Sequence, residues 1–155
     1  MLYLTLKYLH VVGAIVLLGT GAGIAFFMLM AHRTADARLI AHTAGVVVIA
    51  DLLFTATAVV LQPISGAALA MIAGYPMLGG WIGASLALYV LAGVCWLPVV
   101  WIQLRLRNLA REAATSGTPL PQVYFRLWRI WFALGVPAFA AVAAIIWLMI
   151  AKPSF

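Results

Sequence analysis

Four long apolar stretches constrain this chain more than any other feature of its sequence. They cover residues 2–31, 40–62, 80–104 and 127–151. Each has the ~20 residues that an α-helix needs to cross the hydrocarbon core of a bilayer. Because backbone polar groups inside lipid must be paired within the protein, a helix is the spanning form that fits these stretches. The sequence therefore predicts an all-α fold, a four-helix transmembrane bundle that forms a single domain over residues 1–155.

The composition excludes a water-soluble domain. The chain is 67% hydrophobic and 8% charged, whereas soluble domains carry about 25% charged residues. The first stretch also differs from a secretory signal, whose apolar core is about 7–15 residues long and ends at a small-residue cleavage site. It continues through Phe26, Phe27 and Met30 into a basic turn. We therefore interpret it as a retained helix.

The net charge of +6 could suggest a nucleic-acid partner, but the positions of the charges indicate membrane topology instead. His32, Arg33 and Arg38 follow the first stretch, and the connection after the second stretch carries no charge. The segment between the third and fourth stretches carries Arg105, Arg107, Arg111, Arg126 and Arg129. By the positive-inside rule, both basic connections are cytoplasmic and both termini are periplasmic. We expect a multi-pass protein of the bacterial inner membrane that contacts lipid and binds no nucleic acid.

Polar residues in the second and third stretches form two helical stripes. Asp51 lies near the middle of the second stretch, and at about 100° per residue Thr55 and Gln62 fall within about 40° of it. On the third stretch a second stripe lies on one face: Ser85, Tyr89, Trp96 and Gln103. We expect the stripes to face each other or a shared cavity. Asp51 is then either a functional group, as intramembrane carboxylates commonly are, or a protonated residue that joins helices by hydrogen bonds.

The histidines allow a haem but no multi-ligand metal site. His10 and His42 differ in depth by nearly 30 Å at a rise of about 1.5 Å per residue, and no cluster of three or four zinc ligands can be found. A haem needs one histidine as axial ligand. His10 has Gly13 on its own face and Tyr89 and Gln62 at similar depth. It is therefore a candidate ligand of haem iron, although a lone histidine on a membrane helix is more often a hydrogen-bonding residue. His42 is a candidate for a separate site at the inner side.

Four segments carry a resemblance to a known family, and together they span nearly the whole chain: LKYLHVVGAIVLLGTGAGIAFFMLMAHRT, AHTAGVVVIADLLFTATAVVLQPISG, CWLPVVWIQLRLRNLA and RLWRIWFALGVPAFAAVAAIIWLMIAKP. They resemble a bacterial integral-membrane family, the domain of unknown function 2269. The resemblance implies four helices and an inner-membrane location, and it brings no settled activity.

A second resemblance starts from the opening K-x-x-H of Lys7 and His10. Together with His32, the P-x-x-G after the second stretch and the terminal K-P, it is similar to HemJ-type protoporphyrinogen oxidases, four-helix proteins that bind haem b and oxidise a porphyrinogen. This resemblance implies His10 as the haem ligand, with Lys7 beside it. We interpret Lys7 first as a boundary residue whose amine snorkels to the outer surface, and second as a partner for a haem propionate. The family's histidine-bearing third-helix segments read WIGASL and LALYVLAGVCW here. This departure counts against the oxidase activity and leaves a haem or porphyrin pocket open.

These observations lead to three hypotheses, of which the first is favoured. The chain is a haem b-binding protein in electron transfer or tetrapyrrole redox chemistry, and as an enzyme it would be a haem-dependent membrane oxidoreductase. Its partner would be a quinone, a porphyrin or a redox protein, and the His10 ring must face a cavity that holds a macrocycle. The second hypothesis is a small proton-coupled transporter that uses Asp51 and works as a homo-oligomer. The third is a non-catalytic accessory subunit that binds a membrane protein or anionic lipid through its arginines.

Overall fold

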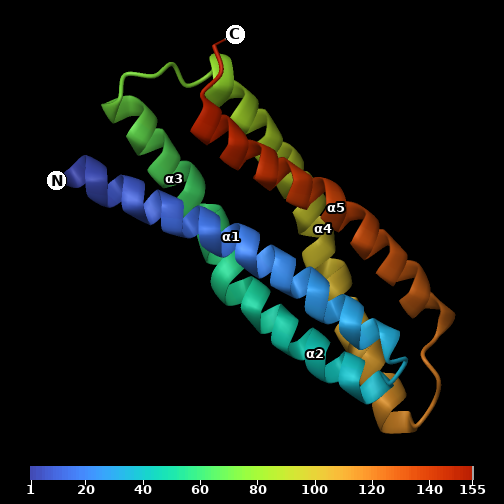
Figure 1. Ribbon diagram of the computed structural model, residues 1–155. Coiled ribbons are helices and arrows are strands. Elements are labelled where there is room, and N and C mark those ends of the chain that lie inside the picture. The colour runs from blue at the N-terminus through green and yellow to red at the C-terminus, as the bar shows by residue number, and fades with distance from the viewer. Residues whose placement is uncertain (155) are drawn as a thin grey trace.

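The computed structural model describes residues 1–154 and contains four helices that are long and apolar enough to cross a membrane. They are α1 (Leu2–Arg33), the continuous helical segment Ala37–Ile72, α4 (Gly80–Ser116) and α5 (Gln122–Ala151) (Figure 1). No strand occurs in this described part of the chain. The predicted all-helical class and the four spans are therefore confirmed.

The second span is longer than predicted and changes its helical type in the middle. α2 (Ala37–Ala50) passes into η1, a π-helical turn over Asp51–Thr55, and then into α3 (Ala56–Ile72). Asp36 caps the start of α2, because its side chain accepts hydrogen bonds from backbone N–H groups of the first turn. The predicted end at residue 62 is wrong, since Pro63 lies inside α3.

Pro63 can lie inside a membrane helix because another helix replaces the donor that it lacks. A proline has no N–H, so the carbonyl four residues earlier, that of Val59, loses its helical hydrogen bond. The hydroxyl of Tyr89 on α4 donates to this Val59 oxygen. In lipid, where water is absent, such a replacement allows the helix to continue.

The other helices also extend beyond the predicted stretches. α1 ends at Arg33 rather than at residue 31, α4 continues to Ser116, and α5 begins at Gln122 rather than at residue 127. Hydropathy marks the part of a helix that lies in the apolar core, whereas the backbone stays helical until a residue interrupts it. For α4 this residue is Gly117, which adopts a left-handed φ of 65° and closes the helix.

The helices meet closely at one end of the molecule and diverge at the other (Figure 1). α5 packs along α4, which also packs against α2, while α1 lies on α2, η1 and α3. Contacts between α1 and α5 are sparse, and α3 hardly touches α4. Both termini lie at the diverging end, whereas the α1–α2 and α4–α5 connections lie at the closed end (Figure 1).

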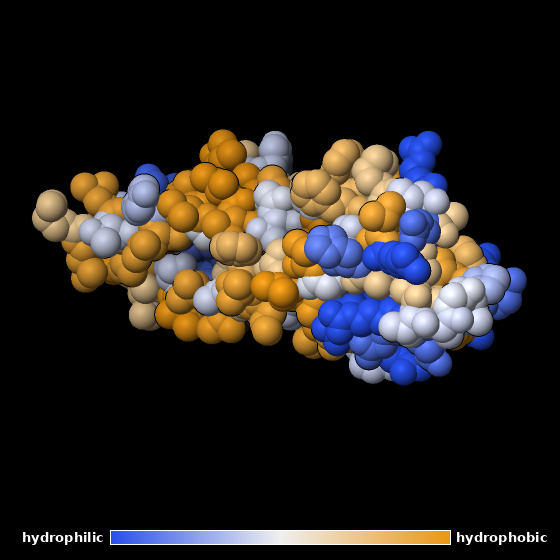
Figure 2. Space-filling view, turned by 90° about the horizontal axis from the view of Figure 1, so that it is seen from below, coloured by the Kyte–Doolittle hydropathy of each residue, from blue (hydrophilic) through white to orange (hydrophobic). Residues whose placement is uncertain are grey.

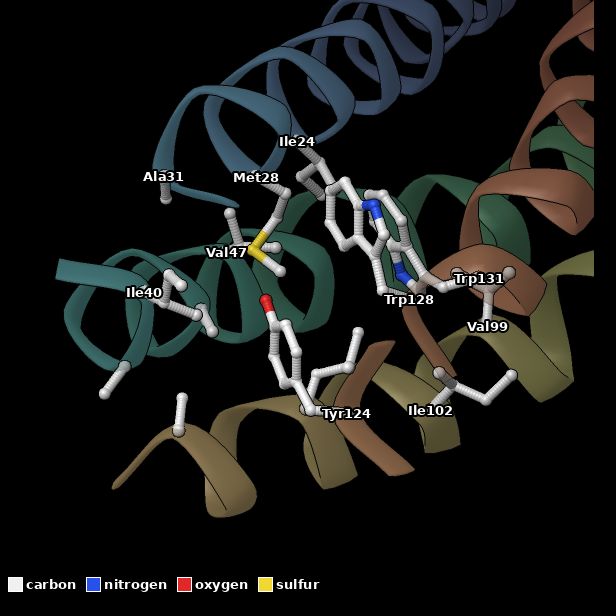
Figure 3. Packing of buried hydrophobic residues seen from close by; sticks show 14 residues of the cluster. Ile24, Met28, Ala31, Ile40, Val47, Val99, Ile102, Tyr124, Trp128 and Trp131 are labelled. Carbon is white, nitrogen blue, oxygen red and sulfur yellow. The ribbon is translucent and has the colours of Figure 1, made fainter. Parts of the chain in front are cut away.

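The packed core fills the closed end with large side chains (Figure 3). Met28, Leu106 and Tyr124 are fully buried there. Trp128 stacks on Trp131 with ring centroids 5.2 Å apart. The surface of the closed end is also where hydrophilic residues gather, while most of the remaining length is apolar (Figure 2). This distribution is the one that a lipid-embedded bundle with polar connections requires.

Candidate functional site

A cavity of about 490 Å³ lies between α1, α4 and α5, and residues of η1 and α3 also line it. Small residues leave this space: a Cβ atom placed on Gly93 or Gly135 would meet no described atom within 4 Å. The wall on α5 also reaches the surface, since the lining residues Phe132 and Phe139 are each 43% exposed. Pockets for small molecules commonly have volumes of about 300–1,000 Å³. The cavity thus has the size of a ligand site and is accessible from the lipid-facing surface.

Asp51 contributes a carboxylate to the cavity wall. It is only 6% exposed, and its Oδ1 accepts a hydrogen bond from the indole Nε1 of Trp96 at 3.3 Å. Asp51 is the first residue of η1, and its carbonyl accepts the backbone N–H of Ala56 across the widened turn. Single π-helical turns inside α-helices frequently occur at functional sites. The irregular turn therefore coincides with the buried carboxylate.

Thr55 ends the same π-helical turn and also lines the cavity. It is 5% exposed, and its hydroxyl lies beside the carboxyl of Asp51, one helical turn earlier. The two side chains therefore form one polar patch in the cavity wall.

Gln62 joins α3 to α1 at the edge of the cavity. Its Nε2 donates to the backbone oxygen of His10 at 2.8 Å. A Cβ atom on Gly13 would overlap Gln62 Nε2. The absence of a side chain at Gly13 therefore lets the Gln62 amide reach the backbone of α1. Close approach over a glycine is a common way for membrane helices to pack.

The third-helix stripe supplies the opposite part of the wall. Gln103 is 1% exposed, and its Oε1 accepts the indole N–H of Trp131 at 3.2 Å. The six stripe residues that line the cavity are Asp51, Thr55, Gln62, Tyr89, Trp96 and Gln103. Ser85 is the exception, because its hydroxyl donates to the carbonyl of Trp81 at 2.7 Å within the same helix, and it does not line the cavity.

His10 does not face the cavity. Its Nδ1 lies 2.8 Å from the hydroxyl of Ser65 on α3, and that hydroxyl lies 2.7 Å from the carbonyl of Leu61. The ring lies over Gly66, where a Cβ atom would be 3.2 Å from His10 Cε1. His10 is absent from the cavity lining in the described chain. The expected orientation toward a macrocycle-sized cavity is therefore wrong, because Ser65 and Gly66 together hold the ring against α3.

Of the other residues predicted to bind a cofactor, Tyr89 lines the cavity, whereas Lys7 and His42 do not. Lys7 is exposed near the start of α1, where its side chain can extend toward an aqueous surface. His42 is exposed on α2. Within the described residues, no three His, Cys, Asp or Glu side chains are grouped so that they could hold a metal ion. The residues present therefore do not fit a haem that His10 ligates in this cavity.

The comparison with family models places the whole bundle in one family. A model described as "Predicted integral membrane protein (DUF2269)" matches residues 4–153. The chain belongs to this family. No curated protein and no solved structure matches the DUF2269 chain. The first resemblance is thus confirmed, the likeness to HemJ-type oxidases stays a resemblance, and the protein is an integral membrane protein.

Sequence reasoning missed the part of the DUF2269 cavity that α5 contributes. Gly135, Val136 and Phe139 line it without carrying a polar group, so no buried charge or polar stripe pointed to them. A signal was present in the small residues of this helix, since Gly135 and Ala138 both face the cavity. Small residues also favour close helix packing. Their presence alone therefore could not distinguish a contact from a void.

Proposed function

We propose that this DUF2269 protein binds a lipid-soluble molecule in the cavity, holds its polar end at Asp51, and acts as a small proton-coupled carrier. The supporting observation is one buried carboxyl group, next to the hydroxyl of Thr55, in the wall of a cavity that reaches the lipid-facing surface. Carboxylates are costly inside a membrane and usually serve a function. A purely structural role for Asp51 accounts for its hydrogen bond with Trp96 but does not explain why the residue borders a cavity.

The coupling follows from the chemistry of a single carboxylate. Protonated Asp51 is neutral and tolerates an apolar surrounding, whereas ionised Asp51 needs a compensating partner. A proton and the polar end of a ligand therefore compete for the same group. Apart from Asp51, Tyr89 is the one titratable side chain in the described cavity wall, and its hydroxyl is engaged with Val59. Competition at one residue is a simple way to link ligand movement to proton movement.

The proposal includes an orientation in the bacterial inner membrane. The closed end carries Arg33 and Arg38, together with the arginines on the last turns of α4 and the first turns of α5. The positive-inside rule places this end in the cytoplasm and both termini in the periplasm. Because four helices enclose the cavity only partly, we expect the carrier to work as a homo-oligomer.

Haem binding at His10 is not part of this proposal. One ring nitrogen of His10 is engaged with Ser65, and a macrocycle in the cavity would find no imidazole there. His10 was the residue that suggested electron transfer and tetrapyrrole chemistry, and its position does not support either. The accessory-subunit hypothesis depends on Arg105, Arg107 and Arg111, is independent of the cavity, and stays a prediction.

A neutral photoreactive probe tests the binding function. The full chain in lipid vesicles, irradiated with a diazirine-bearing long-chain alcohol, should be labelled saturably on the cavity-facing residues of α4 and α5, as mapped by mass spectrometry. Gly93→Leu places a side chain in open space inside the cavity. We expect it to weaken saturable labelling about tenfold, which corresponds to ~1.4 kcal/mol of binding free energy.

Gly19→Leu is the matched control. Gly19 also lies in a membrane helix, and a Cβ atom there likewise meets no atom of the described residues within 4 Å, but Gly19 does not line the cavity. Labelling of this variant should equal that of the wild type. If labelling is spread evenly over lipid-facing residues and both leucine variants behave alike, the proposed function is wrong.

A further inference from the structure

The cavity contains an acidic group without a basic one. Asp51 lines it, and no lysine, arginine or histidine belongs to the part of the wall that the structure describes. The groups beside the Asp51 carboxyl are the indole of Trp96 and the hydroxyl of Thr55, and both are neutral. An ionised carboxylate in an apolar surrounding needs a counter-charge. That charge must come from outside the chain, either as a proton or as part of a ligand.

The walls of the cavity have the chemistry that attracts organic cations. Aromatic faces draw cations through their ring electrons, and more strongly where water is excluded. Five aromatic side chains line the cavity: Tyr89, Trp96, Trp131, Phe132 and Phe139. Together with a single carboxylate, they form a surface that favours positive charge attached to apolar groups.

The same wall disfavours the anionic and hydrogen-bond-accepting ligands expected from the sequence. The propionates of a porphyrin would approach Asp51 with no basic residue in the described wall to offset the repulsion. Quinone oxygens need donors, yet the indole of Trp96, the hydroxyl of Tyr89 and the amide of Gln62 all donate within the protein. The hydroxyl of Thr55 lies beside Asp51. A cation needs none of these donors.

We infer that the ligand class of this cavity is a lipophilic organic cation, whose charge sits beside the Asp51 carboxylate and whose apolar groups contact the aromatic walls. The volume of about 490 Å³ suits a molecule of this kind. Because the site is the one assigned above, the ligand class rests on the proposed function.

Tetraphenylphosphonium is a suitable probe, because its charge is permanent and surrounded by apolar rings. Equilibrium dialysis of the radiolabelled cation against the purified full chain should show saturable binding. Asp51→Asn keeps the shape and removes the charge, so we expect affinity to fall by at least about tenfold. Gly93→Leu should abolish binding by filling the cavity, while Gly19→Leu should bind like the wild type.

Two further measurements separate the outcomes. Asp51→Glu retains the charge and should recover part of the affinity, which distinguishes loss of charge from loss of fold. Tetraphenylphosphonium should also protect the cavity peptides from the neutral photoreactive alcohol. If the cation fails to bind, or binds Asp51→Asn as tightly as the wild type, the ligand class is wrong. If the photoreactive alcohol still labels the cavity and Gly93→Leu still weakens that labelling, the proposed function would stand with a neutral ligand.

Discussion

The closed and diverging ends of this bundle share α1, α4 and α5 and differ in the size of the side chains between them. At the closed end, Met28, Leu106 and Tyr124 are fully buried between helices. Toward the diverging end, Gly93 and Gly135 leave space that no described side chain fills. The side chains between the helices are mainly apolar in both regions, and lipid offers no hydrophobic gain for bringing apolar helices together. The comparison shows that complementary shape, rather than hydrophobicity, determines where membrane helices pack and where they separate.

Backbone irregularities mark the open region as well. η1 and Pro63 both interrupt regular hydrogen bonding in the second span. The Val59 carbonyl that Pro63 leaves free is paired with Tyr89, and the residues that begin and end η1 line the cavity. Irregular backbone at membrane depth is tolerated where it is buried in protein or borders a cavity. In the open region, the carbonyl that Pro63 leaves free is therefore hydrogen-bonded, although side chains do not fill the space.

The largest expected effect comes from breaking the packed end. Trp128 is 8% exposed and stacks on His32 with centroids 4.2 Å apart. Trp128→Ala removes most of a large buried side chain, and the void that remains should lower the free energy of unfolding by about 3 kcal/mol. Reversible unfolding in mixed micelles measures this change. Trp101→Ala is the control, because Trp101 is 59% exposed and should change stability by less than ~0.5 kcal/mol. Equal losses in both variants would contradict the role of Trp128 in packing the closed end.

A smaller effect is expected at the junction of α3 and α4. Tyr89→Phe leaves the Val59 carbonyl without a donor, since Pro63 cannot supply one. Interhelical hydrogen bonds in membranes contribute about 0.6 kcal/mol on average and up to ~1.7. We expect a loss in this range in the same unfolding assay. In a Pro63→Ala background, the restored backbone N–H can bond to Val59, so the same substitution should have little effect. An unchanged loss in that background would show that the hydroxyl acts elsewhere.

The smallest effects compare two glycines, one at a close approach and one at open space. Gly13→Ala would push Gln62 away from the His10 carbonyl and should destabilise the protein by about 1 kcal/mol. Gly93→Ala meets no described neighbour and should be neutral or stabilising by up to ~1 kcal/mol through helix propensity. Thermal unfolding of the two variants side by side measures both changes. Destabilisation by Gly93→Ala would mean that its surroundings are packed in the membrane.

Much of the cavity could be predicted from spacing on a helix. The positions of Asp51, Thr55 and Gln62 on one face, and of Tyr89 and Gln103 on the next helix, follow from residue periodicity. Both sets line one cavity. The π-helical turn could not be predicted in this way, because it depends on how the second span fits its neighbours.

The orientation of His10 illustrates the limit of reasoning from depth and face. Its depth near Gln62 was inferred correctly, since Gln62 bonds to the His10 carbonyl. Its ring turns toward Ser65 and Gly66, which the sequence alone does not connect to it. A helix face describes where a side chain starts, whereas a partner on another helix decides where its ring points.

The sequence by itself determined the all-helical class, the four spans and the polar faces, because backbone pairing in lipid is local and side-chain spacing along a helix is regular. Only the tertiary structure decided which polar groups meet, where Pro63 finds a substitute donor and which region stays open. Those outcomes depend on how the side chains of different helices fit together, and this fit is a property of pairs of helices rather than of any one stretch of sequence.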